Sequence, residues 1–216
     1  MSDRDHGQWM ITSTGKDHYL SGCGAWMNEI DIYDIGHHLA QINRFTGACK
    51  RPYSVAEHSL LCADMAQHDG KSALVQLLCL VHDAHEAYTG DASSPAKNAI
   101  GLAWGTFEHL HADRVRRQLG LITGFVTHRR TVAEYDLIAL ATERRDLTHF
   151  DADRNREWFL DESAAPVKPA AWVNLNSLVR VNATWSAWRD EFLTRFFELQ
   201  RRVHADAAIA PLDTAI

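Results

Sequence analysis

Apolar residues recur at helical spacing through most of the chain. One clear case runs through residues 55–65, where the apolar positions are Val55, Leu61, Cys62 and Met65. Residues three and four apart share one face of a helix, so this spacing predicts an amphipathic helix with His58 on the same inward face. Ser54, followed three residues later by Glu57, matches a capping box at the start of that helix.

Five further segments have helical patterns: residues 34–44, 73–89, 102–119, 131–147 and 178–204. Asp34 is the expected N-cap of the first. Residues 73–80 are apolar at every position except Gln76, which predicts the buried half of a helix that continues to Gly90. The last segment is strongly amphipathic, and we expect it to pack on the core.

The N-terminal residues follow a different pattern. Residues 9–12 and 18–20 are short strand-like runs on either side of the turn sequence at residues 13–16, which predicts a β-hairpin. We therefore expect a mainly α-helical fold, one domain spanning residues 1–216, with a small hairpin inside residues 1–30. Residues 151–176 have the composition of a surface loop, and residues 205–216 are expected to form a frayed tail.

Composition narrows the functional classes. The 216 residues suffice for one sizeable core, and the formal net charge of −6 argues against a polynucleotide-binding surface. The four cysteines form no CxxC pair, and no signal peptide or apolar run long enough for a membrane span is visible. These features predict a cytoplasmic protein that binds neither nucleic acid polymers nor membranes.

The candidate functional residues directly follow the apolar run: His82 and Asp83, then Glu86 and Asp91. An imidazole and three carboxylates are costly to place beside a core without a purpose, and metal binding is the simplest purpose. A His-Asp pair on a helix is more often exposed or a satisfied core pair, so the neighbouring residues matter. His58 precedes His82 by 24 residues, a separation that fits a helical hairpin bringing both rings together.

Asp136 lies one turn before Leu140 in the segment at residues 131–147, on a strip shared with Glu143. The spacing fits either a fourth metal ligand or a solvated charge. With Asp136 included, the ordered set His58, His82-Asp83, Asp136 resembles the HD-domain phosphohydrolases. It is most similar to their small 5′-deoxynucleotidase-like branch, on the features Glu86, Gly90-Asp91 and Arg44-Phe45.

The resemblance implies an HD-type helical bundle in which His58, His82, Asp83 and Asp136 bind one divalent metal. Imidazole and carboxylate ligands suit Mn, Co, Fe, Ni or Zn and do not choose among them. The resemblance further implies that Glu86 is the general acid or base and that Asp91 orients water or assists the leaving oxygen. The implied substrate contacts are Arg44, Phe45 and Lys97.

The implied activity is metal-dependent hydrolysis of nucleotide phosphate esters, with 5′-deoxynucleoside monophosphates as the first choice of substrate. The alternative enzyme is a deoxynucleoside triphosphate triphosphohydrolase, acting for example on dATP and releasing triphosphate. A cyclic-nucleotide phosphodiesterase and a non-catalytic nucleotide sensor rank lower. The expected partner is a small nucleotide, and a homo-oligomer through the terminal helix stays open.

Overall fold

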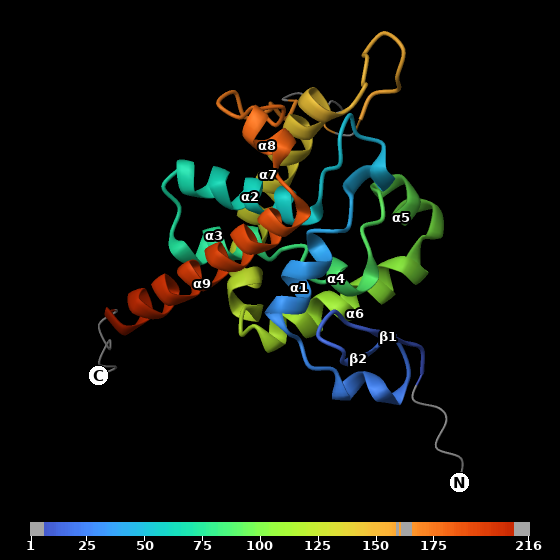
Figure 1. The fold of residues 1–216 in the computed structure, drawn as a ribbon, viewed down its shortest axis with the longest axis vertical. Helices are drawn as coiled ribbons and strands as arrows, with labels where there is room; N and C mark the ends of the chain where they lie inside the picture. Colours follow the sequence, from blue (N-terminus) through green and yellow to red (C-terminus); the bar gives the residue numbers. More distant parts are fainter. Residues whose placement is uncertain (1–6, 159, 161–165, 210–216) are drawn as a thin grey trace.

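The computed structural model describes residues 7–158, 160 and 166–209 of the chain (Figure 1). Its fold is mainly α-helical with a small antiparallel hairpin near the N-terminus, as the sequence predicts. In chain order the elements are β1 (Trp9–Ile11), β2 (Asp17–Tyr19), η1 (Cys23–Met27), α1 (Ile32–Leu39), η2 (Arg44–Gly47), α2 (Val55–His68), α3 (Ala73–Leu80), α4 (Glu86–Thr89), α5 (Ser94–Ile100), α6 (Leu102–Gln118), α7 (Ile122–Leu147), α8 (Leu178–Asn182) and α9 (Trp185–Ile209).

The centre of the fold is α3, which contacts α2, α7 and α9 (Figure 1). Every residue of α3 except the half-buried Leu74 is buried. A helix surrounded on all sides must be apolar all round, which explains the continuous hydrophobic run. Leu78 is fully buried there, so truncation to alanine should cost about 2–5 kcal/mol.

The helix predicted at residue 55 is confirmed as α2. The Ser54 side chain accepts a hydrogen bond from the Glu57 backbone N–H at 3.2 Å. Glu57 does not complete the capping box, because its buried carboxylate instead pairs with Arg51 at 2.7 Å and Arg180 at 3.0 Å. His58 is fully buried, so its inward placement is also confirmed.

The prediction that one helix runs from residue 73 to Gly90 is wrong. Helix α3 ends at Leu80, residues 81–85 form turns, and the short α4 begins at Glu86 and ends at Thr89, followed by the C-cap Gly90, whose φ is 76°. The physical reason lies in His82. Its Nδ1–H donates at 2.8 Å to the carbonyl of Cys79, the acceptor that a continuing helix would offer to the next backbone N–H.

The first helix also begins earlier than predicted. Asp31, not Asp34, is the N-cap of α1, and its side chain accepts from the Tyr33 N–H. Asp34 lies inside the helix, fully buried, where it accepts from the Ser13 hydroxyl at 2.6 Å and the Thr14 N–H at 2.7 Å. Asp34 therefore anchors the hairpin turn to α1.

The predicted hairpin is confirmed, with Trp9 opposite Tyr19 in the register of β1 and β2. From β2 the buried His18 ring stacks on Tyr88 of α4, with centroids 3.8 Å apart and planes 7° apart. The Asn28 side-chain amide is hydrogen-bonded to His18 Nε2, at the edge of the ring, at 3.3 Å. The hairpin thus supports α4, the helix that carries Glu86.

Two later helices are longer than predicted. Helix α7 begins at Ile122 rather than residue 131, with a break in its dihedral angles at His128. The terminal segment divides at Ala183 into α8 and α9, and α9 continues through Ile209. The frayed tail is therefore wrong for residues 205–209, and residues 210–216 lie outside the described part.

Residues 102–118 form α6 as predicted, and the described residues between 151 and 176 contain neither helix nor strand. Among the described residues, none of the helices has the length and apolar character that crossing a bilayer requires.

Candidate metal centre and its cavity

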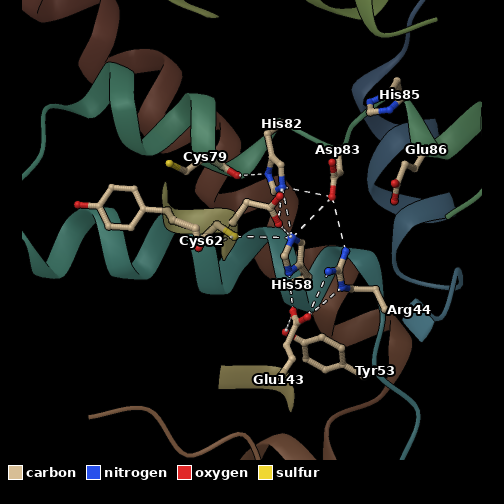
Figure 2. Close-up of polar contacts among 12 residues, drawn as sticks. Arg44, Tyr53, His58, Cys62, Cys79, His82, Asp83, His85, Glu86 and Glu143 are labelled. Carbon is tan, nitrogen blue, oxygen red and sulfur yellow. Dashed lines mark hydrogen bonds and ion pairs between the residues drawn. The ribbon is translucent and has the colours of Figure 1, made fainter. Parts of the chain in front are cut away.

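The two histidines of the predicted site face each other across the α2–α3 hairpin. His58 projects from the second turn of α2, and His82 lies in the turn after α3 (Figure 2). Their Nε2 atoms are 3.3 Å apart, and both rings are buried. The helical hairpin expected from their 24-residue separation therefore brings the rings together.

Two carboxylates complete this arrangement. Asp83 Oδ2 lies 3.2 Å from His82 Nε2 and 3.6 Å from His58 Nε2. Asp136 Oδ1, from α7, lies 3.2 Å from His58 Nε2 and 3.7 Å from His82 Nε2. The four side chains predicted as ligands thus lie together, and Asp136 faces the two imidazoles although its side chain is 43% exposed.

The spacing of these atoms suits one ion. Donor atoms about 2.1 Å from a metal stand about 3.0 Å apart when adjacent in an octahedron and about 3.4 Å apart in a tetrahedron. The measured separations from the two imidazole nitrogens span 3.2 to 3.7 Å. A small adjustment on binding would bring them to either geometry.

The hydrogen bonds of the two rings show which nitrogens are available. His82 Nδ1 donates to the Cys79 carbonyl, and His58 Nδ1 donates to Glu143 Oε1 at 2.5 Å. A carbonyl or carboxylate oxygen can only accept, so both Nδ1 atoms carry the proton and a neutral ring presents its Nε2 lone pair inward. Two lone pairs facing each other at 3.3 Å repel unless a cation or proton lies between them, so the pair fits a bound metal ion.

The carboxylates also favour positive charge at this point. Burial opposes protonation of His82, yet the nearby Asp83 and Asp136 raise its pKa well above the ordinary value. Burial likewise opposes ionisation of Asp136, but hydrogen bonds from His58 and His82 hold its pKa well below the usual range. Carboxylates that stay ionised beside imidazoles are suited to holding a divalent cation.

Cys62 is a further candidate metal ligand, and the sequence analysis assigned it no role. Its Sγ lies 3.7 Å from His58 Nε2 and 3.9 Å from the Tyr135 carbonyl. The ligand atoms of His58, Cys62, His82 and Asp136 all lie within 4.8 Å of one another. Burial raises the pKa of the Cys62 thiol well above its usual value, so it stays protonated as the structure stands.

Glu143 is the most important residue that sequence reasoning missed. It is fully buried on α7, and besides the bond to His58 it accepts from the Tyr53 hydroxyl at 3.0 Å and from Arg44 Nη2 at 3.1 Å (Figure 2). A carboxylate that holds a ligating imidazole fixes both its tautomer and its orientation. The available signal was spacing, because Glu143 follows Asp136 by seven residues, two turns of one helix face.

Arg44 reaches the site from η2, and its side chain is only 11% exposed. It pairs with Glu143 and lies 3.7 Å from Asp83 Oδ2 through Nη1. The next two residues, Phe45 and Thr46, have φ of 56° and 53°, a conformation that costs non-glycine residues about 1–3 kcal/mol each. Such backbone strain is typical of functional sites, and here it places Arg44 inward with Phe45 beside it.

Phe45 is half-buried beside the same site. Its ring centroid lies 5.6 Å from Arg44 Cζ and 6.1 Å from the ring of Trp158. Trp158, in the loop after α7, was not predicted to belong to the site. Its ring comes from a segment more than a hundred residues away in sequence, so no local pattern could have identified it.

Glu86 is 2% exposed at the start of α4, on the far side of Asp83 from the histidines (Figure 2). Its Oε2 has no hydrogen-bond partner among the described residues. Burial, followed by the charges of Asp83 and Asp91, raises the pKa of Glu86 well above its ordinary value. Burial also raises the pKa of Asp91. A buried carboxyl with a raised pKa can hold a proton near neutral pH and release it.

The Lys97 side chain lies near Glu86, but its ammonium group is already paired with Glu108. Its Nζ lies 2.5 Å from Glu108 Oε1 and 3.7 Å from Glu86 Oε1. His85 Nε2 lies 3.5 Å from the same Glu108 oxygen. Glu108 on α6, which sequence reasoning did not identify, therefore holds Lys97 beside Glu86.

A cavity of about 590 Å³ opens from the metal centre between α6 and α7. Its lining includes His82, Asp83 and Asp136 of the candidate metal centre, together with Lys97 and Glu108. Its volume falls within the range of ordinary ligand pockets, roughly 300–1,000 Å³. The candidate metal centre is therefore open to a small molecule rather than sealed in the core.

Comparisons with known proteins give relatives but no function. No family model matches the chain. The chain is 35% identical over 136 residues to the uncharacterized protein YfdR of Escherichia coli, covering 63% of this chain and 70% of that protein. It is 31% identical over 134 residues to the uncharacterized protein RCAP_rcc00048 of Rhodobacter capsulatus, covering 58% and 68% respectively.

Proposed function

This chain belongs to the family of the uncharacterized Escherichia coli protein YfdR, and from its site we propose that it is a metal-dependent phosphohydrolase acting on nucleotides. One observation carries the proposal. The Nε2 atoms of His58 and His82 lie 3.3 Å apart, and an oxygen of Asp83 or Asp136 lies 3.2 Å from each of them. The order of these residues along the chain resembles that of the HD-domain phosphohydrolases, which supports the assignment.

The proposed division of labour is the one that the resemblance implies, and the geometry of the site supports it in part. His58, His82, Asp83 and Asp136 would hold one divalent ion. When bound, such an ion would polarise a phosphoryl oxygen and lower the pKa of water. Glu86 is placed to move a proton, because its carboxyl is buried and its Oε2 is unpartnered among the described residues. Asp91, just past the end of α4, would orient water or assist the leaving oxygen.

The substrate contacts of the proposal are Arg44, Phe45 and Lys97. Arg44 offers a planar fork that suits a phosphoryl group, although in the structure it pairs with Glu143. Lys97 would add a positive charge next to Glu86, and the Phe45 ring would pack against the sugar. We take 5′-deoxynucleoside monophosphates as the reference substrates.

The test compares two isosteric substitutions in the full-length protein. Glu86→Gln should keep its metal and lose roughly 10²–10⁴-fold in turnover, because an amide cannot carry the proton. Asp83→Asn should lose metal and turnover together, because it removes a charged ligand. Metal content is measured by elemental analysis beside hydrolysis of deoxy- and ribonucleoside phosphates, with phosphate and triphosphate resolved as products.

Glu134→Gln serves as the control, since Glu134 is exposed on α7 and should change neither measurement. Metal loss in Glu86→Gln would make Glu86 a ligand. Absence of hydrolysis of every nucleotide by the metal-loaded wild-type protein would refute the proposed function.

A further inference from the structure

Two arginines line the cavity beyond the metal centre. Arg116 comes from α6 and Arg129 from α7, and both line the same cavity as Asp83 and Asp136. The guanidinium carbon of Arg116 lies 4.4 Å from the centroid of the Phe125 ring. One connected space is therefore lined both by His82, Asp83 and Asp136 and by two guanidinium groups.

Neither arginine has an anionic partner. Over residues 7–158, 160 and 166–209, no hydrogen bond or ion pair to a carboxylate is found for Arg116 or Arg129. The acidic groups on this wall are already used: Asp113 pairs with Arg117 at 2.8 Å, and Glu108 pairs with Lys97. A half-buried arginine usually meets a carboxylate, and Arg116 has none among the described residues; Arg129 is exposed.

The two guanidinium groups also act on each other. Burial lowers the pKa of Arg116; the charges of Asp83, Asp113 and Glu108 raise it, and the positive charge of Arg129 lowers it. Two unneutralised cations on one cavity wall are stabilised by an anion that binds between them.

We propose that Arg116 and Arg129 bind a second phosphoryl group of the substrate, distinct from the phosphoryl group that is cleaved at the metal centre. The inference rests on the proposed function and extends its substrate class to nucleotides that carry more than one phosphate. A guanidinium can donate two parallel hydrogen bonds to phosphoryl oxygens, which a lone ammonium cannot do.

The rest of the cavity suits the remainder of such a ligand. Ile122, Phe125, Val126 and Val132 form an apolar part of the lining, against which a base or sugar can pack. The second phosphate can come from two sources, a 5′-polyphosphate chain or the phosphodiester of a short 5′-phosphorylated dinucleotide. Both present the same chemistry to the arginines.

The experiment uses charge-matched double variants of the full chain. The test variant combines Arg116→Gln with Arg129→Gln, and the control combines Arg130→Gln with Arg201→Gln. Both control residues are exposed arginines that do not line the cavity. Calorimetric binding of inorganic triphosphate and of orthophosphate to the metal-loaded proteins is measured first.

We expect the affinity for inorganic triphosphate to fall about tenfold or more in the test variant, or about 1.4 kcal/mol. Affinity for orthophosphate, which occupies the metal end alone, should stay within about twofold, as should both affinities in the control variant. Arg129→Gln alone, at an exposed position, should fold normally and show part of the loss.

Turnover then distinguishes the two sources. Values of kcat/KM for dATP and for a 5′-phosphorylated deoxyadenosine dinucleotide are each divided by the value for dAMP, and the ratio that falls in the test variant identifies the substrate. Unchanged triphosphate binding, or an equal loss in the control variant, would overturn the inference. Because the binding measurement needs no hydrolysis, it remains informative if the wild-type protein cleaves no nucleotide and the proposed function fails.

Discussion

Replacing Glu143 by glutamine tests whether this buried carboxylate supports the metal centre from behind. The substitution keeps the shape of the side chain and removes its charge. In the structure the carboxylate accepts hydrogen bonds from His58 Nδ1, the Tyr53 hydroxyl and two nitrogens of Arg44. The glutamine amide has only one acceptor oxygen. Its NH₂ group would face N–H and O–H donors and could accept no hydrogen bond from them.

The cost can be worked out from these contacts. Hydrogen bonds to charged groups contribute about 1.5–3 kcal/mol each, and glutamine would lose at least one of them outright. Glu143 is 0% exposed and Arg44 only 11%, so the loss leaves the buried Arg44 charge with only its longer contact to Asp83 at 3.7 Å. Breaking a buried pair of this kind costs about 3–5 kcal/mol, a large share of a typical folding free energy of about 5–15 kcal/mol. Removing the partner of a ligating imidazole should also weaken metal affinity about 10–100-fold.

The loss of folding free energy is measured by urea unfolding followed by circular dichroism, with a chelator present so that metal binding does not contribute. The loss of metal affinity is measured by competition with a chelating dye. Tyr53→Phe removes one contact and should cost only about 1 kcal/mol, while Glu134→Gln on the same helix should cost less than about 0.5 kcal/mol. If Glu143→Gln unfolds like the wild type and binds metal within about twofold, the carboxylate has no supporting role and our reasoning about His58 is wrong.

Two further predictions concern residues around the site. Burial lowers the pKa of His18 to about 4, so the folded state stays neutral while the unfolded chain takes up a proton below about pH 6.5. This contribution to stability is therefore lost as pH falls, by about 2 kcal/mol between pH 7.5 and pH 5. In urea unfolding the wild type should lose about 2 kcal/mol more over this range than His18→Phe, which keeps the stacking on Tyr88. Cys62→Ala should retain its metal within about twofold by elemental analysis, because the thiol stays protonated and two imidazoles and two carboxylates remain; loss of the metal would make Cys62 a ligand.

Helices and strands that are specified by contacts within a few residues could be predicted from the sequence. The helix at residue 55, its cap at Ser54 and the inward face with His58 all follow from contacts within a few residues. The N-terminal hairpin and α6 follow in the same way. The residues proposed as ligands could also be identified from the sequence, because the order of His58, His82-Asp83 and Asp136 is itself a sequence feature.

The break after Leu80 shows where local pattern fails. Apolar periodicity continues a helix through residue 81, but a side chain of the turn takes the carbonyl that the helix would use. Helix propensity does not predict whether the Cys79 carbonyl bonds to the His82 side chain or to the next backbone N–H. The result depends on which residues His82 faces in the folded chain. The start of α1 was misjudged for a similar reason, since Asp34 is held by the hairpin turn rather than by its own helix.

The sequence by itself determined which segments become helices and which side chains can serve as metal ligands, because both depend on residue type and short-range spacing. Only the tertiary structure decided what surrounds those ligands. Glu143 meets His58 across 85 positions and Arg44 across 99, and the cavity wall joins Arg116 of α6 to Arg129 of α7. Contacts between residues so far apart depend on how helices pack, and packing follows from the burial of whole faces rather than from any local pattern of residues.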